Sequence, residues 1–419
     1  MKTTRLIAVI AACAAASASA ATRTYCFEML FKDDRWDCPT PSEAGAKRGC
    51  QQDYYNFSSQ PDGYYTHPVG ALVELWDKDD TSDDEYIGTW YLTSETGGCA
   101  TFEWENASYS KGEANPDIYP IWKSEVRSTD DASPHVVATD MSLNPYGGVT
   151  WRSFAYADCA AGTTCTQSGY LLITTDSTTE RGGRAMSLDS AQHMLQTFAP
   201  QMDNEDVDMK WPSTLSQALD RYTFEVEEDR GDQPQSPCHE LGHLLQMQEI
   251  VRDGLQDDCS LNGSGHTLTG TEYESCATAE GWAGYVAITS LWDPEDTSSA
   301  PSRWGIDYVT PTPLEAVCSD NKGIEAQVTK AFWDLDDADN EAGVAPSGND
   351  DEKDSDTLDI ASRWSVFTNG TGNRDDWESD PDGVNLWDYF LNSQSWWANL
   401  TGTRHTLMGH NCMGTQDTN

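Results

Sequence analysis

The sequence is poor in basic residues. Its 419 residues include 25 Lys and Arg against 70 Asp and Glu, so the formal net charge at pH 7 is −45. A chain this negative is repelled by the phosphates of nucleic acids and by anionic membrane surfaces. Composition therefore argues strongly against both as partners.

Two further absences narrow the class of protein. Beyond the first twenty residues, no hydrophobic run is long enough to span a membrane. No two cysteines have the Cys-X-X-Cys spacing, which argues against a zinc ribbon. Because 37% of the residues are hydrophobic and 16 are Trp, a chain of this length can still build two or three cores. The sequence predicts a multidomain globular protein.

Residues 1–20 have the pattern of a secretory signal peptide. Lys2 and Arg5 precede an apolar stretch, and Ala18-Ser19-Ala20 supplies small residues for cleavage. The alternative is a lipoprotein signal in which Cys13 is acylated and anchors the protein at the cell surface. Either interpretation predicts a secreted or surface-attached protein.

The cysteine content fits an oxidising compartment. The chain has 12 cysteines, and most of those after Cys13 are expected to form disulfides. Cys238 is expected to be bridged rather than to act as a nucleophile. Three pairs are close enough in sequence for local bridges: Cys38 with Cys50, Cys159 with Cys165, and Cys259 with Cys276.

Residues 22–176 predict an all-β domain. Alternating apolar segments at 71–76, 86–92 and 101–105 are separated by turns rich in Asp, Ser and Gly. Short strands at such regular spacing favour a sandwich of two packed sheets. The composition then shifts to Thr, Ser, Arg and Gly at 175–184, which predicts a linker.

Residues 185–419 predict an α+β domain in which helices dominate. Ser187 can cap a helix that runs to Phe198, and 207–211 has the pattern of a short strand. Pro212 is expected to end that strand because it has no backbone N–H to donate.

A metal site is predicted in the helical segment after Pro237. His239 and His243 are four residues apart, so both imidazoles lie on one face of a helix and can reach one zinc ion at about 2.1 Å. Glu240 lies next to that face, where it can hold a water on the zinc and take its proton. The alternative is an ordinary helix with two hydrogen-bonded histidines. Three leucines are expected to anchor the helix in the core: Leu241, Leu244 and Leu245.

Glu280 is the preferred third ligand. It lies in a segment whose small residues recur at helical spacing, so this second helix can approach the first closely, with Gly242 helping from the other side. A carboxylate that projects from such a contact points at the metal. The alternative is an exposed helical glutamate. Three residues are held in reserve: His266, Glu272 and Glu274.

The arrangement of His239, Glu240, His243 and Glu280 resembles that of the gluzincin metallopeptidases over residues 238–285. The resemblance implies a zincin-like fold, one catalytic Zn²⁺ and hydrolysis of peptide bonds. It implies three metal ligands, His239, His243 and Glu280, with Glu240 as the catalytic general base.

Family members also have residues that are harder to place here. An acidic residue four positions after the ligand glutamate orients a histidine in many of them, but Gly284 stands at that position. Asp334 and Asp337 are candidates for this orienting role or for binding calcium, and the alternative is that they are solvated acids at a helix end. A Tyr or His donor stabilises the oxyanion in the family, and four residues are eligible: Tyr285, Tyr389, His405 and His410.

The strands of the first half resemble the transthyretin-like β-sandwich of secreted proteins. The resemblance depends on three short motifs: Val73-Glu74-Leu75-Trp76-Asp77, Ile87-Gly88-Thr89 and Glu95-Thr96-Gly97-Gly98. Acidic stretches at 77–85, 350–359 and 378–385 could hold Ca²⁺, although solvated loops have the same composition.

Taken together, these features predict a secreted zinc metalloendopeptidase, with an N-terminal sandwich, a zincin-like second domain and a peptide or protein as substrate. One alternative is a surface binding or adhesion protein with a structural or inactive zinc site. Another is a zincin that hydrolyses something other than a peptide.

Overall fold

The structure is a computed structural model that describes about two-fifths of the chain. It describes residues 21–27, 29–32, 65–66, 70–78, 84–91, 98–104, 115–127, 135–139, 151–152, 157–166, 171–174, 180–198, 201–203, 205–228, 233–250, 268–270, 274–292, 302–303, 306–307 and 324–333.

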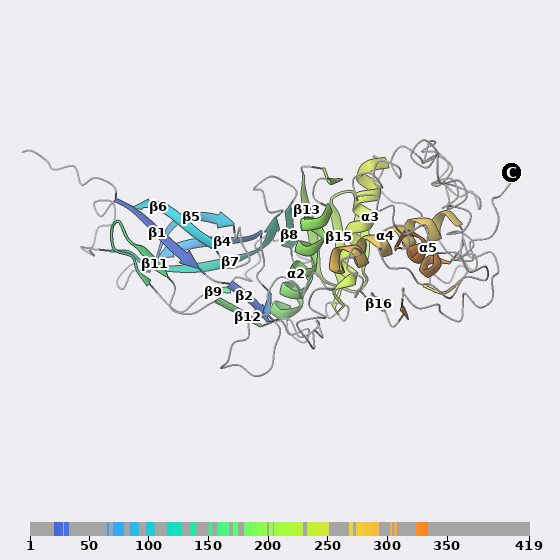
Figure 1. Cartoon of the computed structure of the whole chain (residues 1–419), viewed down its shortest axis with the longest axis horizontal. Coiled ribbons are helices and arrows are strands. Elements are labelled where there is room, and N and C mark those ends of the chain that lie inside the picture. The colour runs from blue at the N-terminus through green and yellow to red at the C-terminus, as the bar shows by residue number, and fades with distance from the viewer. Residues whose placement is uncertain are drawn as a thin grey trace, which may run out of the picture.

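The described part is rich in strands, with helices in the second half. Strands gather at one end of an elongated molecule and the helices lie toward the other end (Figure 1). The helices are α2 (Glu180–Phe198), α3 (Gln235–Ile250), α4 (Glu274–Leu291) and α5 (Glu325–Trp333). Among the described helices, none is long and apolar enough to cross a membrane.

A small sheet of three strands lies at the strand-rich end. Its central strand is β1 (Ala21–Phe27), which pairs antiparallel with β6 (Gly98–Trp104) and parallel with β11 (Thr164–Thr166). A disulfide between Cys26 and Cys99 joins β1 to β6, and a second links Cys159 to Cys165. The predicted local bridge between Cys159 and Cys165 is thereby confirmed. Cys276 is also disulfide-bonded.

A long sheet contains most of the other described strands. Its strand order is β14-β15-β13-β8-β7-β4-β5, with β9 and β10 also paired to β7. In chain order the strands are β4 (Ala71–Asp77), β5 (Glu85–Tyr91), β7 (Asp117–Arg127), β8 (His135–Thr139), β9 (Trp151–Arg152), β10 (Ala157–Asp158), β13 (Asp206–Ser213), β14 (Gln217–Asp220) and β15 (Thr223–Glu227). Two further sheets are described. One has three strands, β2 (Met29–Lys32), β3 (Tyr65–Thr66) and β12 (Leu171–Thr174), and the other has two, β16 (Ser302–Arg303) and β17 (Ile306–Asp307).

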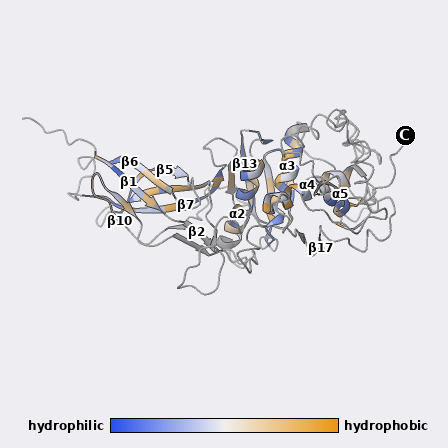
Figure 2. Cartoon of the chain, viewed as in Figure 1, coloured by the Kyte–Doolittle hydropathy of each residue, from blue (hydrophilic) through white to orange (hydrophobic). Residues whose placement is uncertain are grey.

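The three-stranded sheet β11-β1-β6 and the long sheet bury side chains against each other. Val73 and Leu75 of β4 are fully buried, as is Ala100 of β6. The rings of Trp90 and Phe102 meet across the sheets with centroids 6.2 Å apart. Figure 2 shows the apolar segments of these strands beside polar ones. The strands predicted at 71–76, 86–92 and 101–105 are confirmed as β4, β5 and β6.

The long sheet continues from the first half of the sequence into the second. β7 and β8 precede the linker predicted at 175–184, whereas β13 follows it, and β8 pairs parallel with β13 over five residue pairs from His135↔Asp206 to Thr139↔Lys210. Strands from the first half of the sequence and strands beside the helices therefore belong to one hydrogen-bonded sheet.

Two sequence-based boundaries are wrong. Helix α2 begins at Glu180, inside the predicted linker and before the predicted cap at Ser187. Glycine is unfavourable inside a helix, but Gly183 leaves the space that the ring of Trp211 fills, since a Cβ there would clash with that ring. Strand β13 also continues through Pro212 to Ser213. Its register with β15 shifts between Lys210 and Ser213, and such an irregularity accommodates the missing proline N–H.

Candidate metal centre

Helix α3 carries two histidines and is held in the core by buried side chains. Pro237 lies in its first turn, where a missing N–H breaks no helical hydrogen bond. The residues that were expected to anchor the helix are all fully buried: Leu241, Leu244 and Leu245. The anchored helix carries His239 and His243 one turn apart, with ring centroids at 4.6 Å.

Helix α4 packs very closely against α3 beside the two histidines. A Cβ placed on Gly242 would lie 2.9 Å from the Cα of Ala283, closer than real Cβ contacts occur. Ala283 on α4, which was predicted for the face that meets α3, is fully buried, and Ala279 is buried as well. The absence of side-chain bulk lets the two backbones approach, and this brings Glu280 of α4 over the histidines of α3.

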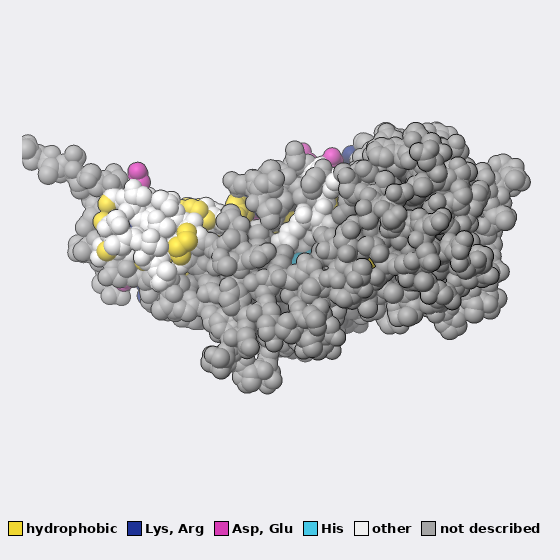
Figure 3. All heavy atoms as spheres, viewed as in Figure 1, with side chains coloured by type: hydrophobic (Ala, Val, Ile, Leu, Met, Phe, Trp, Pro, Cys, Tyr) yellow, Lys and Arg dark blue, Asp and Glu magenta, His cyan; other side chains and the backbone are white. Residues whose placement is uncertain are grey.

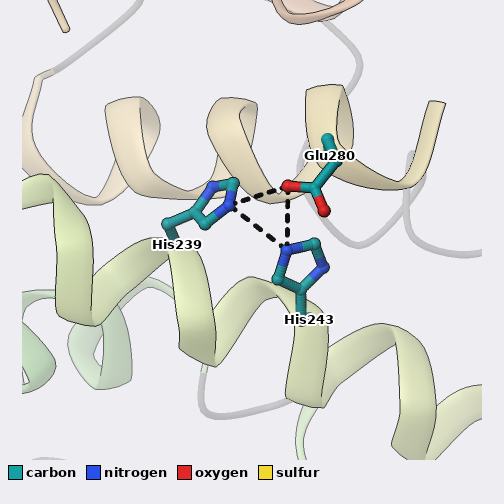
Figure 4. Close-up of side chains that lie close together, drawn as sticks. All are labelled: His239, His243 and Glu280. Atoms are coloured by element: carbon teal, nitrogen blue, oxygen red, sulfur yellow. Dashed lines mark hydrogen bonds and ion pairs between the residues drawn. The ribbon is translucent and has the colours of Figure 1, made fainter. Parts of the chain in front are cut away.

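Three atoms of the kind that bind metal ions converge between the helices (Figure 4). Glu280 Oε2 lies 3.0 Å from His239 Nε2 and 3.2 Å from His243 Nε2. The two Nε2 atoms are 3.2 Å apart. The close-up shows both imidazoles and the carboxylate pointing toward one another from the two helices.

The spacing of these atoms suits a small metal ion. Three ligands at about 2.1 Å from a tetrahedral zinc would be about 3.4 Å apart, near the three separations found here. The side chains are buried, with 4% of His239, 8% of His243 and 8% of Glu280 exposed. In the space-filling view, a small area of histidine surface is visible near the middle of the molecule (Figure 3). The group can bind a metal ion.

His243 carries an unusual pKa that reflects its neighbours. Burial lowers the pKa of its imidazole, but the charge of Glu280 and the hydrogen bond to it outweigh burial and raise the value to about 9. Glu240 and Gln246 add smaller contributions in the same direction. The carboxylate of Glu240, which is 6% exposed, is therefore close enough to act electrostatically at the site.

Gln246 contacts the site and was missed by the sequence analysis. It is 1% exposed, and its Oε1 lies 3.2 Å from His243 Nδ1. Its Nε2 donates to the backbone oxygen of Ala279 at 3.1 Å. The one available signal was its position three residues after His243, which places it on the same helix face.

Two other residues named in the sequence analysis, Tyr285 and Cys238, are fully buried. Tyr285, a candidate oxyanion donor, is fully buried, and its ring packs beside Trp282 and Phe332 at centroid distances of 5.4 and 5.7 Å. Cys238 is a buried thiol that donates a hydrogen bond to Ser190 O at 3.2 Å. The disulfide expected at Cys238 is therefore wrong, because the thiol faces the backbone of α2.

Several predicted residues lie outside the described part of the chain. They are Cys38, Cys50, Cys259, His266, Glu272, Asp334, Asp337, Tyr389, His405 and His410. Glu274 opens α4, but its side chain is not among those described. The acidic stretches at 350–359 and 378–385 also lie outside it, and the described residues contain no second metal-ligand group, so calcium stays a prediction.

Comparisons with known protein families, with curated proteins and with solved structures find no match to this chain. The function is therefore inferred from the residues and geometry of the site itself.

Proposed function

We propose that this chain is a zinc-dependent hydrolase, and specifically a metalloendopeptidase of gluzincin type. The observation that supports this best is the convergence of His239, His243 and Glu280 from two helices, with the Glu240 carboxylate beside them. Two histidines and one glutamate are the ligand set of catalytic zinc sites that leave a position open.

Zinc is the metal that fits this set best. Two imidazoles and one carboxylate can also hold iron or other divalent ions, but Glu240 directly after the first ligand is the residue that hydrolytic zinc sites require. When bound, zinc would supply Lewis acidity, polarising the scissile carbonyl and making a water more acidic. A structural site would have no need of an acid–base group at position 240.

The chain's own residues then have distinct roles. His239, His243 and Glu280 hold the metal, and the close contact of α3 with α4 keeps them aligned. Glu240 accepts a proton from the attacking water and returns it to the leaving amine. General acid–base catalysis of this kind contributes about two to four decades in rate.

We also propose a fold for each half of the chain and a location for the protein. The first half would be a transthyretin-like sandwich that binds or positions substrate, and the helical part would be zincin-like. Export with cleavage after residue 20 would be consistent with the disulfides Cys26–Cys99 and Cys159–Cys165.

The deciding experiment compares the purified protein with its Glu240→Gln variant. Zinc content is measured by elemental analysis, and hydrolysis is followed on casein. Glutamine preserves the size of the side chain but cannot accept the proton, so we expect equal zinc and at least a hundredfold loss of activity. Elemental analysis also shows whether iron occupies the site instead.

Glu125→Gln is the matched control. Glu125 is a glutamate of similar burial, 4% exposed, that pairs with Arg127 on β7 rather than with the metal centre. This variant should keep both zinc and activity. Bound zinc without hydrolysis of casein or varied peptides in any of the proteins would support a binding or adhesion protein instead, and absence of any metal would refute the site.

A further inference from the structure

Gln246 makes contacts on both sides of the metal centre through one amide group. Its oxygen faces His243 of α3, while its nitrogen faces the carbonyl of Ala279, the residue before Glu280 on α4. The side chain is 1% exposed, so water does not compete for these contacts. One buried amide thus reaches a ligand on one helix and the backbone beside a ligand on the other.

The Ala279 carbonyl determines which way this amide is oriented. A carbonyl oxygen can only accept, so the NH₂ of Gln246 must face it and the amide oxygen must face His243 Nδ1. The amide oxygen in turn can only accept, so Nδ1 must carry a proton. In the neutral imidazole the lone pair then lies on Nε2, which is the nitrogen that faces His239 and Glu280.

We propose that Gln246 is a positioning residue for the metal centre. It selects the His243 tautomer that binds metal through Nε2, and it links the histidine on α3 to the backbone that carries Glu280. This inference rests on the proposed metal site and supplies the histidine orienter that the sequence left open.

Glutamine suits this position because it combines an acceptor and a donor. A glutamate could accept from His243 Nδ1 but would place a second oxygen against the Ala279 carbonyl. A leucine of similar size could neither accept a hydrogen bond from the histidine nor donate one to the carbonyl. The two substitutions therefore separate the contact with the histidine from the contact between the helices.

Gln248 offers a closely matched control. It lies two residues further along α3 and is 5% exposed. Its amide also bridges two backbone groups, accepting from Asp203 N at 3.0 Å and donating to Arg221 O at 2.8 Å. Replacing it with leucine removes two partly buried amide hydrogen bonds, neither of which touches a ligand of the metal.

The experiment measures zinc affinity by competition with a chromophoric chelator, alongside thermal unfolding of the metal-free proteins. We expect Gln246→Leu to weaken zinc binding by about 10- to 100-fold, the usual effect of losing such a partner of a ligand histidine. Gln248→Leu should lower the unfolding temperature but leave zinc affinity unchanged. Gln246→Glu should restore much of the affinity while still lowering the unfolding temperature.

The outcomes are distinguishable. Equal losses of zinc affinity in the two leucine variants would reduce Gln246 to a packing role, and unchanged affinity in Gln246→Leu would refute the inference while leaving the metal site intact. Failure of Gln246→Glu to bind more tightly than Gln246→Leu would refute the role in the tautomer. A wild-type protein without zinc affinity would overturn the proposed function and this inference with it.

Discussion

At the scale of single residues, the protonation of His243 makes the metal centre sensitive to pH. Burial lowers the pKa of this histidine, but Glu280 raises it from 6.5 to about 9 in the metal-free protein. The protonated form therefore stabilises the metal-free fold. Because the folded pKa is the higher one, this contribution is complete below about pH 6.5 and is lost as the pH rises through about 9.

Zinc binding should therefore release a proton from His243 across this range. Zinc needs a neutral imidazole, so its apparent affinity should increase about tenfold per pH unit between roughly pH 6.5 and 9, then level off. Calorimetry in two buffers of different ionisation enthalpy measures the number of protons released. An affinity that does not change from pH 7 to 9 would contradict the pairing of His243 with Glu280.

At the scale of elements, the contact between α3 and α4 depends on the missing side chain at Gly242. A methyl group there would meet the backbone of Ala283 at 2.9 Å, so the helices would have to separate. Gly281 has the same role on the other contact of α4, where a Cβ would lie 2.5 Å from Val328 of α5. Thr329 Oγ1 also donates to Gly281 O across that contact.

Alanine at either glycine should destabilise the protein, but only one should affect the metal. We expect Gly242→Ala and Gly281→Ala each to lower the free energy of unfolding by about 1–3 kcal/mol, the usual effect of overpacking. Only Gly242→Ala separates the helices that carry the ligands, so it alone should weaken zinc binding. Chelator competition and denaturant unfolding measure the two effects, and equal zinc affinities would show that the ligands tolerate a change in helix spacing.

At the scale of the whole molecule, the shared sheet joins the strand-rich end to the helices. β8 lies between β7 and β13 in this sheet. Helix α2 contacts β7 and β8 as well as α3 and α4. The helices that carry the metal centre are thus supported by strands from the first half of the sequence.

A fragment of residues 185–419 should therefore fail to form the metal centre. It lacks β8, which leaves one side of β13 without its partner strand, and it lacks the first turn of α2. We expect reduced helical circular dichroism and no tight zinc binding. A fragment of residues 128–419 keeps β8 and all of α2 and should retain more of both. Full zinc affinity in the shorter fragment would show that the second half folds independently.

Much of the site could be predicted from local sequence because its geometry is local. The spacing of His239 and His243 places both on one face of any helix, and small residues around Glu280 indicated a close helix contact. The strands at 71–76, 86–92 and 101–105 followed from alternation of apolar residues. Each of these inferences needed only residues a few positions apart.

The tertiary structure decided what depends on residues far apart in the chain. The distances from Glu280 Oε2 to the histidines follow from the packing of α4 on α3, and the role of Gln246 depends on a carbonyl 33 residues away. Cys238 faces Ser190, and β8 pairs with β13 across a segment that looked like a linker. A sequence pattern reports which side chains share a face, whereas the partner that the face meets is set by packing of the whole chain.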